Sequence, residues 1–402
     1  MPTGSQIASA LRCKPRRNRT KILSVSFVVL AFASSQALTR PSFAGQNSPG
    51  GINVLANPGS PPPHLVFAAD QPTPELTALL SDPRVTADLI SLKAGIAINL
   101  SDLSAQRAAL VRQLNRDAIP VTAWLTLPPE LGYYLNAGNA ALAETRFRQF
   151  ETWTSANDLH WAAIGLDIEP DIHDFAAIKQ ESKARLFFTL LGRYADFRRV
   201  QAAKRTYSAL IREIQSRGYS VDTYQFPFIA DERAVRSSVL QRITGILDVR
   251  GNREFLMLYS SFNPSLDSAL IWVYGNDAQG IVVGSTAGPS SGPHFARLDW
   301  EEFSRDLLVA HHFSNVIGVY NLEGCVRQGF LVRLKQLDWN DSVAISAPSI
   351  RSATRLRTRI QWGLRIVSDL PYILALIALA IAIVYWRKRR LRRIARSAAA
   401  IA

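Results

Sequence analysis

Eight short apolar runs alternate with longer amphipathic stretches along the middle of this chain. This alternation constrains the fold more than any other feature. The runs are rich in β-branched and aromatic residues and are bounded by turn residues, which is typical of buried strands. They lie at residues 64–69, 95–100, 121–127, 164–168, 220–226, 255–260, 280–285 and 316–322. Helical patterns occupy residues 102–116 (with Ser101 as N-cap), 140–155, 175–217 (as two helices), 232–247, 266–274, 300–312 and 326–337.

Strands that alternate with helices pair in parallel, because each helix carries the chain back to the start of the next strand. Eight such units between residues 64 and 341 predict an α/β fold, a (β/α)8 or TIM barrel. An open doubly wound sheet has the same alternation and stays the alternative. In either fold the functional residues lie at the carboxyl ends of the strands.

The formal net charge of +14 comes from the two ends of the chain. Basic residues without intervening acids cluster at 12–21 and at 387–396, and arginines recur at 351–365. The remaining residues carry nearly balanced charges. We therefore expect no nucleic-acid partner, since this distribution is typical of membrane topology signals.

Residues 1–44 have the parts of a secretory signal peptide: a basic cluster, a short apolar run at 22–33, and small residues at the exit. Residues 45–63 are rich in Asn, Gly, Ser and Pro and predict a linker. Cys13 lies in the signal peptide and leaves Cys325 without a partner. We therefore expect an exported domain without an intrachain disulfide.

Residues 370–386 form an apolar segment with aromatic residues at both ends, followed by a basic tail at 387–402. This pattern predicts one C-terminal transmembrane helix with a cytoplasmic tail. Residues 342–369 are polar and basic and are expected to be a juxtamembrane linker. The barrel would then lie on the extracytoplasmic side of the cell membrane, in a single-pass protein.

The fourth apolar run ends in two carboxylates, Asp167 and Glu169, just before Pro170. Residues two apart in a strand point to the same face, so both side chains project together at a carboxyl end. Close carboxylates raise one another's pKa, and glycosidic bond cleavage needs an acid that keeps its proton near neutral pH. In the alternative, the two residues cap the next helix or pair with arginines.

Other polar and aromatic residues fall at or near the ends of the predicted strands. Aromatic rings can stack on sugar faces, although packing inside the barrel is the alternative for each of them. A polar side chain at a strand end can bind substrate, and a carboxylate there can also serve as a base. The candidate substrate-binding residues are Trp124, Tyr224, Gln225, Tyr320 and Glu323.

The segment Gly-Leu-Asp-Ile-Glu at 165–169 resembles the fourth-strand signature of the chitinase-like glycoside hydrolases, family 18. That signature has four acids in the spacing D-x-x-D-x-D-x-E. Here Ala162 and Gly165 stand at the first two acidic positions, and Asp167 and Glu169 at the last two. The segment Met-Leu-Tyr-Ser at 257–260 resembles the sixth-strand motif of the same family.

The resemblance implies an N-acetylated polysaccharide as substrate, chitin-like or peptidoglycan, and cleavage without a cofactor or a metal. Glu169 would protonate the leaving glycosidic oxygen. Asp167 would hold the N-acetyl group, whose carbonyl oxygen attacks the anomeric carbon, and Tyr259 would hydrogen-bond this acetamide. Glu169, Asp167 and Tyr259 are therefore the candidate catalytic residues.

Two other functions remain open. Asp167, Glu169, Asp171 and His173 alternate, so an extended backbone would place four metal ligands on one face for a metal-dependent hydrolase or deacetylase. The two missing acids equally favour a barrel that binds a glycan or a protein beside the membrane and catalyses nothing.

Overall fold

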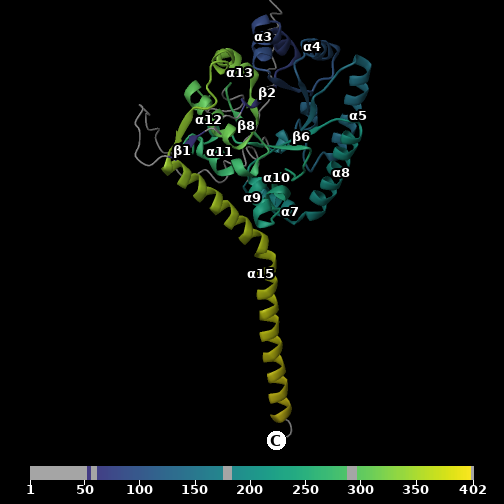
Figure 1. Ribbon diagram of the computed structural model, residues 1–402. Helices are drawn as coiled ribbons and strands as arrows, with labels where there is room; N and C mark the ends of the chain where they lie inside the picture. The colour runs from purple at the N-terminus through teal and green to yellow at the C-terminus, as the bar shows by residue number, and fades with distance from the viewer. Residues whose placement is uncertain (1–51, 56–60, 175–182, 288–296, 400–402) are drawn as a thin grey trace, which may run out of the picture.

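The computed structural model describes residues 52–55, 61–174, 183–287 and 297–399 (Figure 1). Eight parallel strands form a closed barrel in the order β2-β3-β4-β5-β6-β7-β8-β9, and β9 pairs with β2. The closure confirms the predicted TIM barrel and excludes the open sheet. The expected signal peptide, 1–44, lies outside the described residues.

The barrel strands follow the predicted apolar runs closely. They are β2 (His64–Ala69), β3 (Gly95–Asn99), β4 (Val121–Leu125), β5 (Ala163–Asp167), β6 (Val221–Gln225), β7 (Arg253–Met257), β8 (Gly280–Gly284) and β9 (Val316–Tyr320). Most of the predicted runs continue past the carboxyl end of the strand. Buried apolar residues such as Leu100, Ile168, Phe226 and Leu258 directly follow four of these strands.

Helices surround the barrel, and several differ from the predicted ranges. They are α2 (Thr73–Leu80), α3 (Pro83–Ser91), α4 (Ala105–Arg116), α5 (Ala140–Asn157), α7 (Lys183–Ala195), α8 (Phe197–Ser216), α9 (Phe228–Val235), α10 (Val239–Thr244), α11 (Ala269–Tyr274), α12 (Trp300–Phe313), α13 (Leu322–Arg327) and α14 (Phe330–Leu334). Short 3-10 helices lie at η1 (Pro129–Leu131), η2 (Ser260–Phe262) and η3 (Gly275–Asp277).

Three helix predictions need correction. Ser104, and not Ser101, caps α4, because the Ser104 side chain accepts a hydrogen bond from the Arg107 amide at 3.1 Å. The single helices predicted at 232–247 and 326–337 are each two short helices, broken where Arg236 and Gly329 adopt left-handed backbone. The helix predictions also lack α2 and α3, which both have a proline in the first turn, a position that suits proline.

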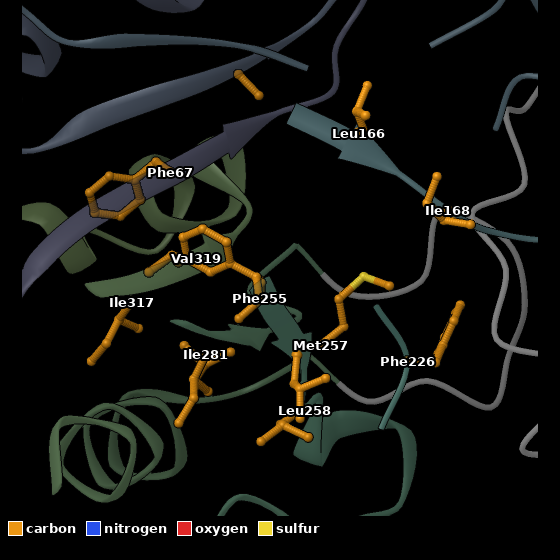
Figure 2. Close-up of a cluster of buried hydrophobic side chains, with 14 of the residues drawn as sticks. Phe67, Leu166, Ile168, Phe226, Phe255, Met257, Leu258, Ile281, Ile317 and Val319 are labelled. Atoms are coloured by element: carbon orange, nitrogen blue, oxygen red, sulfur yellow. The ribbon is translucent and has the colours of Figure 1, made fainter. Parts of the chain in front are cut away.

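Buried side chains lie on both faces of the barrel strands (Figure 2). Phe255 and Met257 belong to one face of β7, whereas Leu258, the residue after this strand, points the other way and packs with Ile281. Such fully buried aliphatic and aromatic side chains each stabilise a fold by about 1.5–3 kcal/mol. The barrel therefore has the apolar core that a domain without a disulfide needs.

The linkers predicted at 45–63 and 342–369 contain strands and a helix, so the prediction that these segments are only linkers is wrong. β1 (Ile52–Leu55) pairs antiparallel with β10 (Ser342–Ile345), and one long helix, α15 (Ala347–Ala399), follows at once. The first part of α15 packs against α9 and α11. The rest extends away from the barrel beyond α7, α9 and α10 (Figure 1).

A buried carboxylate fixes α15 to the barrel. Asp231 of α9 accepts hydrogen bonds from Arg357 Nε at 3.0 Å, Gln361 Nε2 at 2.9 Å and the Tyr274 hydroxyl at 2.7 Å. The Arg357 guanidinium also pairs with Asp277 at 2.7 Å. Of the arginines before the apolar segment, Arg357 therefore docks α15 on the barrel.

Candidate active site

A one-residue extension of the sheet holds the two predicted carboxyl groups. β5 ends at Asp167, and the next residue, Ile168, bridges in parallel to Leu135 in the loop after β4. The Glu169 amide then donates to the Leu135 carbonyl at 3.1 Å. Asp167 and Glu169 keep the extended spacing in this way, and both side chains point into one cavity at the carboxyl end of the barrel.

The cavity has a volume of about 60 Å³ and is lined mostly by aromatic and aliphatic side chains. It brings together six predicted site residues from five strands or the segments that follow them: Trp124, Asp167, Glu169, Tyr224, Tyr259 and Tyr320. The other lining residues include Tyr134, Phe226, Met257 and Phe262. Such a mainly apolar cavity with a few converging polar groups is typical of small-molecule sites.

Burial makes the two carboxyl groups unusually weak acids. Asp167 and Glu169 are 4 % and 7 % exposed, and Asp167 Oδ1 and Glu169 Oε2 have no hydrogen-bond partner among the residues that the structure describes. Burial, and next the charge of Asp70, raise the pKa of Asp167 to about 8. Burial, and then Asp167 and Asp70, raise the pKa of Glu169 well above its usual value. No cation among the described residues offsets these shifts, so the capping and arginine-pairing alternative is wrong.

Three residues that are not among the predicted site residues complete this end of the barrel. Asp70, directly after β2, accepts hydrogen bonds from the Tyr133 hydroxyl and from the Tyr320 hydroxyl at 3.3 Å. Burial raises its pKa to about 6. Tyr133 and Tyr134 lie in the loop after β4, with their rings edge to face at 4.8 Å. In the sequence, the adjacent aromatic residues in the segment Gly132-Tyr133-Tyr134 were the signal that could have indicated Tyr133 and Tyr134 as site residues.

Two predicted substrate-binding residues lie outside the cavity lining. Gln225 is fully buried, and its amide donates to the carbonyls of Leu247 and Val249, both at 3.1 Å. It therefore holds the loop after α10. Glu323 is the second residue of α13, and its carboxylate accepts a hydrogen bond from Asn321 Nδ2 at 2.9 Å. Burial raises the pKa of Glu323 to about 8.

Tyr259 lies against Tyr320 in the cavity, with 5.8 Å between the ring centroids. Burial, and next the charges of Glu169 and Asp167, raise the pKa of Tyr259 well above its usual value. Its hydroxyl therefore keeps its proton at neutral pH. A protonated tyrosine beside a protonated carboxylic acid provides two hydrogen-bond donors in one small cavity.

The ring of Tyr224 explains why position 165 is a glycine and lacks the acid of the fourth-strand signature. A Cβ atom on Gly165 would lie 3.0 Å from Tyr224 Cε2 and 3.5 Å from Thr122 Cγ2. Tyr224 in turn stacks on Phe255, with 5.1 Å between the centroids. This aromatic pair occupies the barrel interior where an acidic side chain at position 165 would extend.

Gly165→Ala should therefore lower the free energy of unfolding by about 1–3 kcal/mol, the usual cost of overpacking a core. Denaturant unfolding of the purified chain measures this. Gly192→Ala in α7 is the control, because nothing lies within 4 Å of its added Cβ, and it should be neutral or stabilising by up to about 1 kcal/mol. Equal stability of Gly165→Ala and the wild type would show that the Tyr224 ring can move aside.

The raised carboxyl pKa values also predict a pH dependence of stability. The folded protein binds more protons than the unfolded chain between the ordinary carboxyl pKa, 3.8 for Asp167, and about 8. Stability is thus fully present below about pH 4 and falls by up to about 1.4 kcal/mol per pH unit for each such group as the pH rises to about 8. Asp167→Asn cannot ionise, so it should gain stability relative to the wild type over this range. A constant difference between the two unfolding free energies would contradict the shift.

The predicted metal ligands do not share a face. The extended backbone ends before Pro170, and His173 lies in a helical turn with its ring on Asp171 at 2.9 Å. Both of these side chains face solvent, whereas Asp167 and Glu169 are buried. Among the described residues, no group of three or more His, Cys, Asp or Glu side chains could hold a metal ion.

No protein-family model matches the sequence, and no curated protein does. Solved structures that are similar include the glycoside hydrolase domain of PgaB from Bordetella bronchiseptica, at 11% identity and TM-score 0.39, covering 68% of this chain and 98% of that one.

Two other solved structures are also similar. A D-allulose 3-epimerase from Methylomonas sp. shows 12% identity and TM-score 0.38, covering 74% of this chain and 99% of that one. Gas2p of Saccharomyces cerevisiae, in complex with laminaritetraose and laminaripentaose, shows 12% identity and TM-score 0.35, covering 67% and 59%. The similar solved structures thus include a glycoside hydrolase domain and an epimerase.

Proposed function

We propose that the chain is a membrane-anchored glycoside hydrolase that cleaves an N-acetylated polysaccharide, chitin-like or peptidoglycan, by acid-assisted glycosidic cleavage. The observation that carries the proposal is the buried pair Asp167 and Glu169 in one cavity, with a free oxygen on each and no compensating cation. A carboxyl group in this environment keeps its proton at neutral pH, as a general acid must.

In the proposed reaction Glu169 gives its proton to the leaving glycosidic oxygen as the bond to the anomeric carbon breaks. The acetamide carbonyl oxygen of the substrate forms the new bond to that carbon. Asp167 orients the acetamide, and Tyr259 donates a hydrogen bond to it. Water then opens the cyclic intermediate and returns a proton to Glu169, so the product keeps the configuration of the substrate.

The cavity size favours this route. At about 15 Å³ for each water centre, 60 Å³ has room for about four water molecules. An acetamide group with four heavy atoms has a similar size, whereas a whole sugar ring is larger. The N-acetyl group would enter the cavity, and the sugar ring would lie at its mouth.

The apolar part of α15 is the proposed membrane anchor. Among the described residues, α15 is the helix long and apolar enough to cross a bilayer, with a mean hydropathy of 2.3 over its most apolar window. None of that window is buried against the barrel. With the signal peptide expected at 1–44, the barrel would lie on the extracytoplasmic side of the cell membrane.

A glycan-binding barrel without activity is the second candidate, and the glycine at position 165 favours it. The test uses the full chain in detergent with chitin oligomers and peptidoglycan fragments. Release of shorter products with retained configuration supports the hydrolase. Saturable binding without any product supports the binding barrel, and neither binding nor product contradicts both.

A further inference from the structure

The part of α15 next to the apolar segment has an outward stripe that the barrel does not cover. Arg355, Arg359, Trp362 and Ile366 follow one another at spacings of four, three and four residues, so they share one face of the helix. Trp362 and Ile366 are 60 % and 59 % exposed. Ala353 and Leu364, on the opposite face, are buried against the barrel.

The corner between α7 and α8 contacts α15 directly after the end of this stripe. The Tyr194 hydroxyl donates to the Val367 carbonyl at 2.8 Å, and the hydroxyls of Ser237 and Ser368 are 2.9 Å apart. Val367 precedes Leu370, where the apolar segment begins, by about 4.5 Å along the helix axis. This corner is therefore next to the point where α15 would enter the bilayer (Figure 1).

Large apolar side chains are exposed on this corner as well. Leu191 is 50 % exposed, and Phe197 is 52 % exposed although the Arg242 guanidinium stacks on its inner face at 3.8 Å. We call Leu191, Phe197, Trp362 and Ile366 the membrane-proximal patch. Two of its residues belong to α15 and two to the adjacent corner.

The charges around the patch match an anionic surface. The side chains of Arg198, Arg359 and Arg365 are exposed there. The carboxylates nearby are Asp369 in α15 and Asp196, which precedes Phe197 and lies 4.0 Å from Arg199. Arginine binds phosphate oxygens in paired hydrogen bonds, and tryptophan is enriched in the headgroup layer of bilayers. A basic, aromatic surface beside a membrane span fits anionic lipid headgroups.

We propose that the membrane-proximal patch rests in the headgroup layer of an anionic bilayer and seats the barrel on the membrane. This inference rests on the proposed membrane span of α15. Docking through Arg357 makes α15 and the barrel one body, so contact at the patch would fix the orientation of the cavity relative to the bilayer. A flexible stalk would leave that orientation free.

Spin labels on the full chain test the proposal. In a Cys13→Ser background, where Cys325 is buried, nitroxides are attached at Phe197→Cys, Ser216→Cys and Ile377→Cys. Ser216 is the matched control, because it is exposed on the same helix, α8, about 28 Å from Phe197. Ile377 reports on the anchor itself. Accessibility to oxygen and to a water-soluble nickel chelate is measured in bilayers of phosphatidylcholine with phosphatidylglycerol.

The label at 197 should be several-fold less accessible to nickel and more accessible to oxygen than the label at 216. If the label at 377 lies in hydrocarbon but the labels at 197 and 216 are equally accessible, membrane contact of the patch is contradicted and the membrane span of α15 is supported. If the label at 377 is in water, both the membrane span of α15 and the membrane contact of the patch are contradicted. Protection of 197 from both reagents would indicate a protein partner and overturn the lipid assignment. Equal depth in pure phosphatidylcholine would overturn the role of the arginines.

Discussion

Glu169→Gln is expected to lower the rate of glycan hydrolysis by about 100- to 10,000-fold, the usual contribution of a general acid. The folded state should survive, because burial keeps the Glu169 carboxyl protonated and glutamine copies its shape and its lack of charge. Product release from chitin oligomers measures the first effect. Denaturant unfolding measures the second, which should stay within about 1 kcal/mol of the wild type.

Glu323→Gln is the matched control for this variant. Glu323 is also buried at the carboxyl end of the barrel, and its pKa is raised to about 8, but it does not line the cavity. Hydrolysis by Glu323→Gln should therefore stay within a few-fold of the wild type. The assignment of the acid would be reversed if Glu323→Gln lost activity and Glu169→Gln kept it.

Arg357→Ala should lower the free energy of unfolding by about 3 kcal/mol, which is typical when one partner of a buried ion pair is removed. The substitution leaves Asp231 fully buried without its cation and also removes the ion pair with Asp277. The first part of α15 should then detach from α9 and α11. Denaturant unfolding and hydrogen exchange of residues 353–364 measure these two effects.

Arg359→Ala is the control for the docking of α15. It removes the same side chain two residues further along the same helix, where the arginine is exposed. Its effect on the unfolding free energy should stay within about 0.5 kcal/mol. Equal effects of the two substitutions would contradict the docked arrangement and would support the flexible linker expected from the sequence.

The barrel and most of the cavity were predictable because strand residues obey a strict alternation. Once β5 was recognised, the spacing of two placed Asp167 and Glu169 on one face. The same alternation brought Trp124 and Tyr224 to the interior. Gln225 illustrates the limit, since it directly follows Tyr224 and therefore points out of the barrel, towards the loop after α10.

Features that depend on contacts between distant residues could not be predicted. Tyr133 reaches the cavity from a loop that has no periodic pattern, and its bond to Asp70 spans 63 residues. β1 and β10 are four residues long and pair only with each other, so each alone has the composition of a linker. The partner of Arg357 lies 126 residues earlier in the chain.

The central claim is that Glu169 supplies the proton to the leaving glycosidic oxygen. The most direct test compares the wild type with Glu169→Gln on two N-acetylglucosaminides, one with a sugar leaving group and one with dinitrophenolate. Dinitrophenolate departs without protonation, so only the sugar substrate needs the acid. We predict that Glu169→Gln loses cleavage of the sugar substrate and keeps bond cleavage of the dinitrophenyl substrate. Equal loss on both substrates would contradict the assignment.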